Sequence, residues 1–422
     1  MVELPRLLSD FTPAHGLIKA DYTDFVVEEI PLYPADGTGS HTYFLLEKAG
    51  LTTPQAVHDI ARELNVRRHE IGFAGLKDSK AITRQWMSVE HVDPERLAKL
   101  YLARLRILET TRHRNKLRLG HLKGNAFTIK VRQTEPQRLA ELQDALAELT
   151  RRGVPNYFGS QRFGYRGDSW AIGQAIVRRQ IDAAVALVVG RPTPEDYGDI
   201  LQARQLYERG EYLLAARAWP AVFHTERRVL KSLAQSGGNP RRGFGAIDRT
   251  TRTFYVSAYQ SYLFNQVMTA RLPAGLDQLW EGDLAWLHAS GAVFRVENVE
   301  VEQPRADTFD ISPTGPLFGY RMTEPTGRPG DLEASILAAE GLSPDAFHQA
   351  PLHVKGARRP LRFRPDDARL SLGADERGPY LELRFVLPRG CYATALLREF
   401  FRLETPQAAE PGNDEETEAA PP

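Results

Sequence analysis

The pattern of apolar and polar residues predicts strands towards both ends of the chain. In these segments apolar residues alternate with polar ones at a period of two, which is typical of strands buried on one face. The segments are 25–30, 41–47, 85–89, 105–110, 127–131 and 380–387. Because alternating strands occur near both ends of the sequence, we expect the two ends to contribute to one domain.

Helical periodicity predicts helices between and after these strands. Thr53 and Pro54 are typical of an N-cap and a first helical residue, and apolar residues then recur at helical spacing up to Leu64. Other helices are expected at 94–102, 136–151, 168–190, 197–218, 254–272 and within 388–400. Tyrosine and phenylalanine form a stripe along 254–272, which favours a helix that faces the core.

The texture of the sequence changes at Gly153, where a loop rich in glycine, aromatic residues and arginine precedes the long helical segments. Alternating strands return beyond residue 360. We therefore predict an α/β (α+β) protein in which residues 1–154 plus 361–403 form one domain and residues 155–360 are inserted into it. Residues 404–422 are expected to be a disordered acidic tail.

Composition is typical of a globular protein, since 42% of the 422 residues are hydrophobic and 26% are charged. There is no apolar stretch of about 18 residues, and the N-terminus lacks the pattern of a secretory signal. We therefore expect no membrane association. The single cysteine, Cys391, excludes an internal disulfide and fits a reducing cytosol. No cysteine or histidine spacing suggests zinc.

Charge is balanced overall but unevenly distributed. The tail from Glu404 to Pro422 holds six acidic residues and no lysine or arginine, so the rest of the chain carries an excess of six positive charges. Basic residues gather in two segments, 104–123 and 355–364. Each segment is consistent either with a phosphate-binding surface or with an ordinary solvated face.

Residues 71–89 are the stretch on which the chemistry depends. An apolar run ends at Gly75, Lys77-Asp78-Ser79-Lys80 follows, and the next strand begins shortly afterwards. Catalytic groups concentrate on loops of this kind, and a carboxylate close to cations stays ionised at neutral pH. Such a group can act as a nucleophile or a base. An ordinary surface turn has the same local composition, however.

Four other positions have the side chains that an RNA-modifying site needs. Lys19 is a possible ion-pair partner for Asp78, Phe25 and Tyr392 offer flat apolar faces, and Asn125 offers an amide donor and acceptor. Individually these residues are better explained as a surface lysine, two core rings and a turn cap. Together they are consistent with a site that holds a base extruded from folded RNA.

Six segments resemble the TruD family of tRNA pseudouridine synthases, and they occur in the family's order between residues 19 and 399. They are KADYTDFVVEE (19–29), GFAGLKDSKAITRQ (72–85), LKGNAF (122–127), GVPNYFGSQRFG (153–164), SAYQSYLFN (257–265) and LPRGCYATALLRE (387–399). The resemblance implies isomerisation of uridine to pseudouridine in tRNA, typically uridine 13 of the D arm. It also implies that neither a cofactor nor a metal is needed.

The resemblance further implies a fold and a set of site residues. The fold is a catalytic domain with a bent, mixed, largely antiparallel sheet and flanking helices, interrupted by an inserted α/β domain that the family calls TRUD. Asp78 and Lys19 match the family's catalytic aspartate and its basic partner. The substrate-binding positions match Phe25, Asn125, Phe127 and Tyr392. The family has phenylalanine at the last position, so the Tyr392 hydroxyl needs a partner if it is buried.

These considerations predict a cytoplasmic, monomeric tRNA-modifying isomerase with tRNA as its partner and no metal. Two alternatives remain at this stage. A non-catalytic RNA-binding protein on the same scaffold would explain the basic segments and the aromatic residues. An unrelated enzyme with an aspartate nucleophile, such as a phosphoryl-transferring hydrolase, would need further acidic residues to hold Mg²⁺, and no D-x-D motif lies near Asp78.

Overall fold

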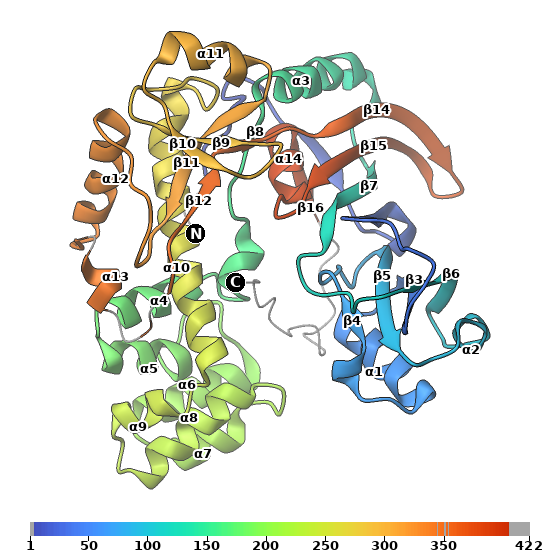
Figure 1. Ribbon diagram of the computed structural model, residues 1–422. Helices are drawn as coiled ribbons and strands as arrows, with labels where there is room; N and C mark the ends of the chain where they lie inside the picture. The colour runs from blue at the N-terminus through green and yellow to red at the C-terminus, as the bar shows by residue number, and fades with distance from the viewer. Residues whose placement is uncertain (1–3, 344, 350–351, 353, 405–422) are drawn as a thin grey trace. The chain divides into compact units, whose positions relative to one another are not determined.

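The computed structural model describes residues 4–343, 345–349, 352 and 354–404 (Figure 1). The chain divides into two compact units. Among the described residues, unit 1 contains residues 4–5 and Tyr157–Arg362, and unit 2 contains Arg6–Asn156 and residues 363–404. The assignment of a catalytic and an inserted domain stays a prediction. Glu404 is the last residue of a strand, and residues 405–422, where the acidic tail is predicted, lie outside the described residues.

Unit 2 is built on a ten-stranded sheet. Its strands are β1 (Ala14–Leu17), β2 (Phe25–Pro31), β3 (His41–Ala49), β4 (Gly72–Phe73), β5 (Ile82–Glu90), β6 (Leu105–His113), β7 (Leu122–Arg132), β14 (Asp366–Asp375), β15 (Gly378–Pro388) and β16 (Phe401–Glu404). The main path runs β14-β15-β7-β2-β5-β3-β6. Pairs β1–β16 and β2–β5 are parallel, whereas the other pairs are antiparallel. The prediction of a mixed α/β fold with a largely antiparallel sheet is therefore confirmed.

Four helices accompany this sheet: α1 (Thr53–Leu64), α2 (Pro94–Ala98), α3 (Leu139–Arg152) and α14 (Ala393–Phe400). The apolar face of α1 packs against strands β3 and β5 in a core that includes Phe44, Leu46, Ile60 and Met87, all fully buried. Burial of these side chains stabilises the sheet by roughly 2 kcal/mol each. The short strand β8 (Val154–Pro155) follows α3 directly.

The start of α1 differs from the prediction in a way that matters for the site. The N-cap is Thr52, whose hydroxyl accepts a hydrogen bond from the backbone N–H of Gln55, while the Gln55 side chain accepts one from the Thr52 N–H. This reciprocal arrangement satisfies two backbone donors at the helix start. Thr53 is thereby released from capping and lies fully buried as the first helical residue.

Unit 1 combines a helical region with a smaller sheet. Its helices are α4 (Ser169–Val177), α5 (Ile181–Val189), α6 (Gly198–Glu208), α7 (Tyr212–Ala218), α8 (His224–Gln235), α9 (Pro240–Gly245), α10 (Arg249–Arg271), α11 (Val299–Asp307), α12 (Arg328–Ala339) and α13 (Asp345–Gln349). Its sheet has the order β10-β9-β11-β12, with β9 (Leu284–Leu287), β10 (Val293–Arg295), β11 (Ile311–Leu317) and β12 (Ala357–Pro360). Strand β13 (Arg362–Phe363) follows at the unit boundary.

Two of the predicted helices are each divided into a pair. Segment 168–190 is interrupted because Arg179 adopts a left-handed conformation with φ of 59°, and segment 197–218 because Gly210 has φ of 75°. These backbone conformations end a right-handed helix. Short polar connections therefore produce pairs of helices in contact with each other where the sequence pattern suggested single long helices.

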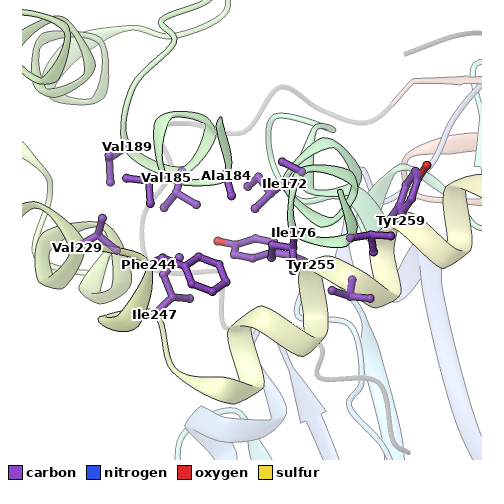
Figure 2. Close-up of a cluster of buried hydrophobic side chains, with 14 of the residues drawn as sticks. Ile172, Ile176, Ala184, Val185, Val189, Val229, Phe244, Ile247, Tyr255 and Tyr259 are labelled. Carbon is purple, nitrogen blue, oxygen red and sulfur yellow. The ribbon is translucent and has the colours of Figure 1, made fainter. Parts of the chain in front are cut away.

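Helix α10 supplies the centre of the apolar core of unit 1. Figure 2 shows Tyr255 of this helix among side chains from α4, α5, α8 and α9, with Tyr259 farther along the helix. The Tyr259 side chain is fully buried and Tyr255 is 8% exposed. The prediction that the aromatic stripe of this helix fills the core is therefore confirmed. No helix among the described residues is both long and apolar enough to cross a membrane.

Candidate active site

Asp78 lies in the loop that connects β4 to β5, within unit 2. One carboxylate oxygen, Oδ1, accepts a hydrogen bond of 3.0 Å from the backbone N–H of Lys80. The other, Oδ2, accepts one from the Lys19 ammonium group. Only 28% of the Asp78 side chain is exposed. The carboxylate is thus held in one orientation by a backbone donor and a charged donor, which is more than a solvated surface turn requires.

Lys19 reaches Asp78 from a strained part of the backbone. Its φ of 58° places this non-glycine residue in the left-handed region, which costs on the order of 1 kcal/mol or more. The preceding residue, Ile18, is anchored by a 3.0 Å hydrogen bond from its N–H to the carbonyl of Glu404 in β16. The Lys19 ammonium group also lies 4.4 Å from the centre of the Phe25 ring, a favourable cation–π distance.

Three aromatic rings line the same face of the sheet. Phe25 begins β2 and meets Phe127 of β7 edge to face, with ring centroids 6.3 Å apart. Phe127 stacks on Phe385 of β15 at 5.1 Å, with an angle of 18° between the ring planes. Phe127 is the central member because β7 lies between β2 and β15. The rings therefore form a continuous aromatic surface beside the Lys19–Asp78 pair, in which Phe127 is partly exposed while Phe25 and Phe385 are buried.

Asn125 lies two residues before Phe127 on the same strand and so points to the same face. Its register partners are Glu29 on β2 and Leu387 on β15. The side-chain oxygen Oδ1 is buried and has no hydrogen-bond partner within the described part of the chain. The adjacent Gly124 allows close packing here, since a Cβ on it would lie 2.3 Å from the Leu387 carbonyl oxygen. A buried, unsatisfied amide oxygen is available to a bound molecule.

Contacts therefore bring Lys19, Phe25, Asp78 and Phe127 together, and the strand register places Asn125 on their face of the sheet. Tyr392 is the N-cap residue of α14 and is partly buried, shortly after the end of β15. Its role in the site stays a prediction. The functional roles of the other five residues also stay predictions, although their geometry is consistent with a shared site.

A buried ion pair next to the site was not anticipated from the sequence. Lys77 does not turn towards Asp78, because its ammonium group pairs with Glu29 at 2.6 Å, and the two side chains are 5% and 1% exposed. Glu29 also accepts a 3.3 Å hydrogen bond from the backbone N–H of Trp86. Burial raises the pKa of Glu29, while the Lys77 charge acts in the opposite direction. This pair fastens the Asp78 loop to β2.

The two basic segments have different environments. In the first, Arg104, Arg106, Arg114, Arg118 and Lys123 are exposed, so a phosphate-binding surface is physically possible there. In the second, the interpretation as a phosphate-binding surface is wrong for Arg358 and Arg362. Arg358 pairs with the buried Glu333 at 2.7 Å, and Arg362 is fully buried with its guanidinium group 4.2 Å from the centre of the Phe309 ring.

Two of the sequence motifs in unit 1 bind each other. The Asn265 side chain accepts a hydrogen bond from the Phe158 N–H and donates one to the Phe158 carbonyl, each 3.0 Å long. Arg162 donates to the hydroxyl groups of Ser257 and Ser261 at 2.8 and 3.0 Å. The polar residues of segments 153–164 and 257–265 thus fix a loop onto α10.

The site in unit 2 can therefore perform a limited range of chemistry. It presents one oriented carboxylate with a cationic partner, an apolar aromatic surface and an unsatisfied amide oxygen. These groups suit proton transfer or nucleophilic attack on a flat, partly polar ring that rests on the aromatic surface. An aromatic surface and an amide are the groups with which proteins hold unstacked nucleic-acid bases.

Known proteins resemble this chain over nearly its whole length. The sequence model of the family described as tRNA pseudouridine synthase D (TruD) matches residues 1–400. A relative from Geobacter metallireducens, described as tRNA pseudouridine synthase D, is 46% identical over 388 residues, which cover 92% of this chain and 95% of the relative. A relative from Geobacter sulfurreducens with the same description is 43% identical over 397 residues, covering 94% and 96%.

A solved structure leads to the same comparison. A crystal structure from Methanosarcina mazei, described as a tRNA pseudouridine synthase D (TruD), superposes on this chain with a TM-score of 0.80 and is 28% identical in sequence. The superposition covers 93% of this chain and 94% of that chain. The similarity therefore extends across both units.

Proposed function

This chain belongs to the TruD family of tRNA pseudouridine synthases, and from that premise we propose that it converts uridine 13 in the D arm of tRNA to pseudouridine with Asp78 as the catalytic group. The chain is accordingly an RNA pseudouridine synthase, an intramolecular isomerase. The observation that most directly supports the role of Asp78 is its pairing with Lys19 beside the Phe25 and Phe127 rings.

The reaction breaks one bond and forms another within a single nucleotide. Asp78 attacks the nucleotide or removes a proton from its ribose, and the N1–C1′ bond breaks. The uracil then turns so that C5 bonds to C1′. As C5 bonds to C1′, the bond to Asp78 breaks or, in the other route, Asp78 returns the proton to the ribose. C5 loses its proton and N1 gains one, so no atom is added overall. Lys19 keeps the carboxylate oriented while charge is redistributed in the sugar.

Base flipping is needed because the reacting atoms are inaccessible within stacked RNA. The extruded uracil rests against the aromatic surface of Phe25 and Phe127, where stacking contributes on the order of 1–3 kcal/mol. Asn125 supplies the amide that contacts the polar edge of the base, and Tyr392 contributes a further ring. A detached uracil must remain bound until C5 reacts. The aromatic surface therefore both holds the base by stacking and excludes water from the reacting atoms.

The exposed basic segment 104–123 is proposed to bind the tRNA backbone. With one cysteine and an RNA-modifying activity, the protein is proposed to act in the cytoplasm, as a monomer and without a metal. Size-exclusion chromatography with multi-angle light scattering measures the molar mass in solution and so tests whether the protein is a monomer. Turnover that persists in excess chelator tests metal independence, and loss of turnover in chelator would contradict it.

Tritium release tests the proposed reaction, because the hydrogen on C5 of uridine is lost when C5 bonds to the ribose. Purified protein is incubated with unmodified tRNA that carries [5-³H]uridine. We expect one tritium released per tRNA and a pseudouridine mapped to position 13. A tRNA with cytidine at position 13 is the matched control and should release none. Binding without tritium release would instead favour an RNA-binding protein without catalysis.

A further inference from the structure

Beneath the Asp78 loop lies a lysine that neither the sequence motifs nor the proposed reaction accounts for. Lys48, near the end of β3, is fully buried. Its register partners are Thr83 on β5 and Leu105 on β6, neither of which carries charge. No ion pair joins it to a carboxylate among the described residues. An ammonium group without a carboxylate partner is costly to bury, which calls for an explanation.

The partners of Lys48 are backbone carbonyl groups, and two of them belong to the Asp78 loop. The ammonium group donates to the carbonyl of Asp78 at 2.9 Å and of Lys77 at 3.4 Å, and also to the carbonyl of Leu51. A protonated lysine has three N–H donors, so the three contacts use all of them. The side chain therefore connects the end of β3 to the loop that carries the proposed catalytic aspartate.

Uncharged anchors hold the same loop from the side of α1 and β5. The N–H of Lys77 donates to the Thr53 hydroxyl at 3.0 Å, and this hydroxyl donates to Gln85 at 3.0 Å. Gln85 in turn donates to the carbonyl of Gly75 at 3.1 Å. Thr53 and Gln85 are fully buried. These anchors fix the loop before Asp78, whereas Lys48 binds the Asp78 peptide group itself.

We propose that Lys48 is a positioning residue, which in its protonated form fixes the Asp78 peptide group so that the carboxylate stays aligned with Lys19 and the aromatic surface. This inference rests on the proposed role of Asp78. A neutral amine has only two N–H donors, and its lone pair would face a carbonyl oxygen. Loss of the proton therefore removes at least one of the three contacts and loosens the loop.

The ionisable groups around Lys48 support a dependence on pH in the working range. Burial lowers the pKa of Lys48 to about 8, with the Lys77 charge acting in the same direction and the Asp78 charge opposing both. Turnover should therefore decline as the pH rises through about 8, while tRNA binding, which depends on surface charges elsewhere, changes little.

The test compares Lys48→Met with Thr53→Val and Lys130→Met in the full-length protein. Lys130 is a matched control, because its ammonium group lies on the same sheet but contacts Asp375 instead of the loop. For Lys48→Met we expect kcat to fall by about 10- to 100-fold, since small misplacements of catalytic groups have effects of this size. KM for tRNA should change by less than about threefold, and Lys130→Met should behave like the wild type.

The pH profile separates positioning from a purely structural role. In the wild type and in Thr53→Val, kcat should decline above about pH 8, whereas Lys48→Met should lack this decline. Lys48→Arg, which stays protonated, should also lack it and serves if Lys48→Met fails to fold. A wild-type decline that persists unchanged in the folded Lys48 variants would overturn the proposal, as would a normal kcat in Lys48→Met.

Failure of this inference differs from failure of the proposed function. If Asp78→Asn abolishes turnover while Lys48→Met retains the wild-type kcat and pH profile, only the role of Lys48 is wrong. If Asp78→Asn turns over normally, the proposed catalytic role fails first, and the role of Lys48 fails with it.

Discussion

Two asparagines, one in each unit, show how differently buried amides are used in this protein. In unit 1, Asn265 on α10 satisfies both the N–H and the carbonyl of Phe158, so its side-chain oxygen and nitrogen both help to hold a loop. In unit 2, Asn125 on β7 has a buried Oδ1 without a partner within the described residues. Both asparagines lie in segments that resemble motifs of the family. Only Asn125 has a side-chain oxygen that accepts no hydrogen bond from the described residues.

The difference follows from what each region must do. Unit 1 uses its motifs to fix a loop onto α10, and Arg162 with Ser257 and Ser261 completes that attachment. Unit 2 keeps an unsatisfied amide, an oriented carboxylate and an aromatic surface on one face of a sheet. An unpaired buried polar atom lowers stability, and under the proposed function the bound uracil supplies the missing partner of Asn125.

Of the variants that compare the two asparagines, Asn125→Ala is expected to have the larger effect on activity. Since Oδ1 has no partner among the described residues, the unfolding free energy should stay within about 1 kcal/mol of the wild type. Loss of the contact to uracil should lower kcat/KM by about 100-fold, which corresponds to roughly 3 kcal/mol. Pseudouridine formation and urea unfolding of the same preparations measure both quantities. A large loss of stability with normal turnover would contradict this prediction and show that Asn125, like Asn265, has a structural role.

Asn265→Ala should give the opposite result. The substitution leaves the buried N–H and carbonyl of Phe158 without partners, which should lower the unfolding free energy by about 2–4 kcal/mol. The kcat of the folded fraction should remain close to that of the wild type, because the residue lies in a different unit from Asp78. Denaturant titration combined with active-site-independent quantification of folded protein provides the measurement. A loss of kcat without loss of stability would contradict this interpretation.

In the wild type, the contribution of Lys48 to the unfolding free energy and its contribution to kcat should change in opposite directions as the pH rises. Burial lowers its pKa from 10.5 to about 8, so between these values the folded state holds fewer protons than the unfolded state. The contribution of Lys48 to stability is therefore unfavourable below about pH 8 and becomes less so as the pH rises. From pH 7 to 9.5 the wild type should gain about 2 kcal/mol relative to Lys48→Met, while its kcat declines. Parallel changes of stability and kcat would contradict the assignment.

The smallest effect is expected on the basic surface of unit 2. Replacing Arg106 and Arg118 by alanine should weaken tRNA binding only severalfold at physiological salt. Each lost phosphate contact should reduce the slope of log Kd against log salt concentration by about 1. Arg151→Ala is the control, because this exposed arginine on α3 is paired with Glu148. Arg358→Met, in the buried segment, should lower stability and leave the salt slope unchanged.

Much of the fold follows from periodicity alone, as the strands of unit 2 and the core-facing stripe of α10 illustrate. Burial of single charged residues was harder to foresee. Arg358 and Arg362 resemble a basic surface in sequence, but tertiary partners bury them. Lys48 resembles an ordinary residue at a strand end. The alternation of Phe44, Leu46 and Lys48 along β3 was the one signal that its side chain points inwards.

The site was accessible to prediction only in part. The resemblance to a family supplied Lys19 and Asp78, and the structure joins them. It did not supply Glu29 as the partner of Lys77, because Glu29 lies far from Lys77 in the sequence. Side-chain direction in a loop depends on distant strands, here β2 and β3, and local sequence carries little information about them.

Asp78→Asn tests the central claim most directly, because it keeps the size of the side chain and an oxygen that can accept from the Lys80 N–H. Single-turnover formation of pseudouridine is measured with saturating enzyme, together with tRNA affinity and the unfolding midpoint. We predict no detectable pseudouridine, tRNA affinity within about twofold of the wild type and an unfolding midpoint within a few degrees. Pseudouridine formation at a rate near that of the wild type would contradict the account.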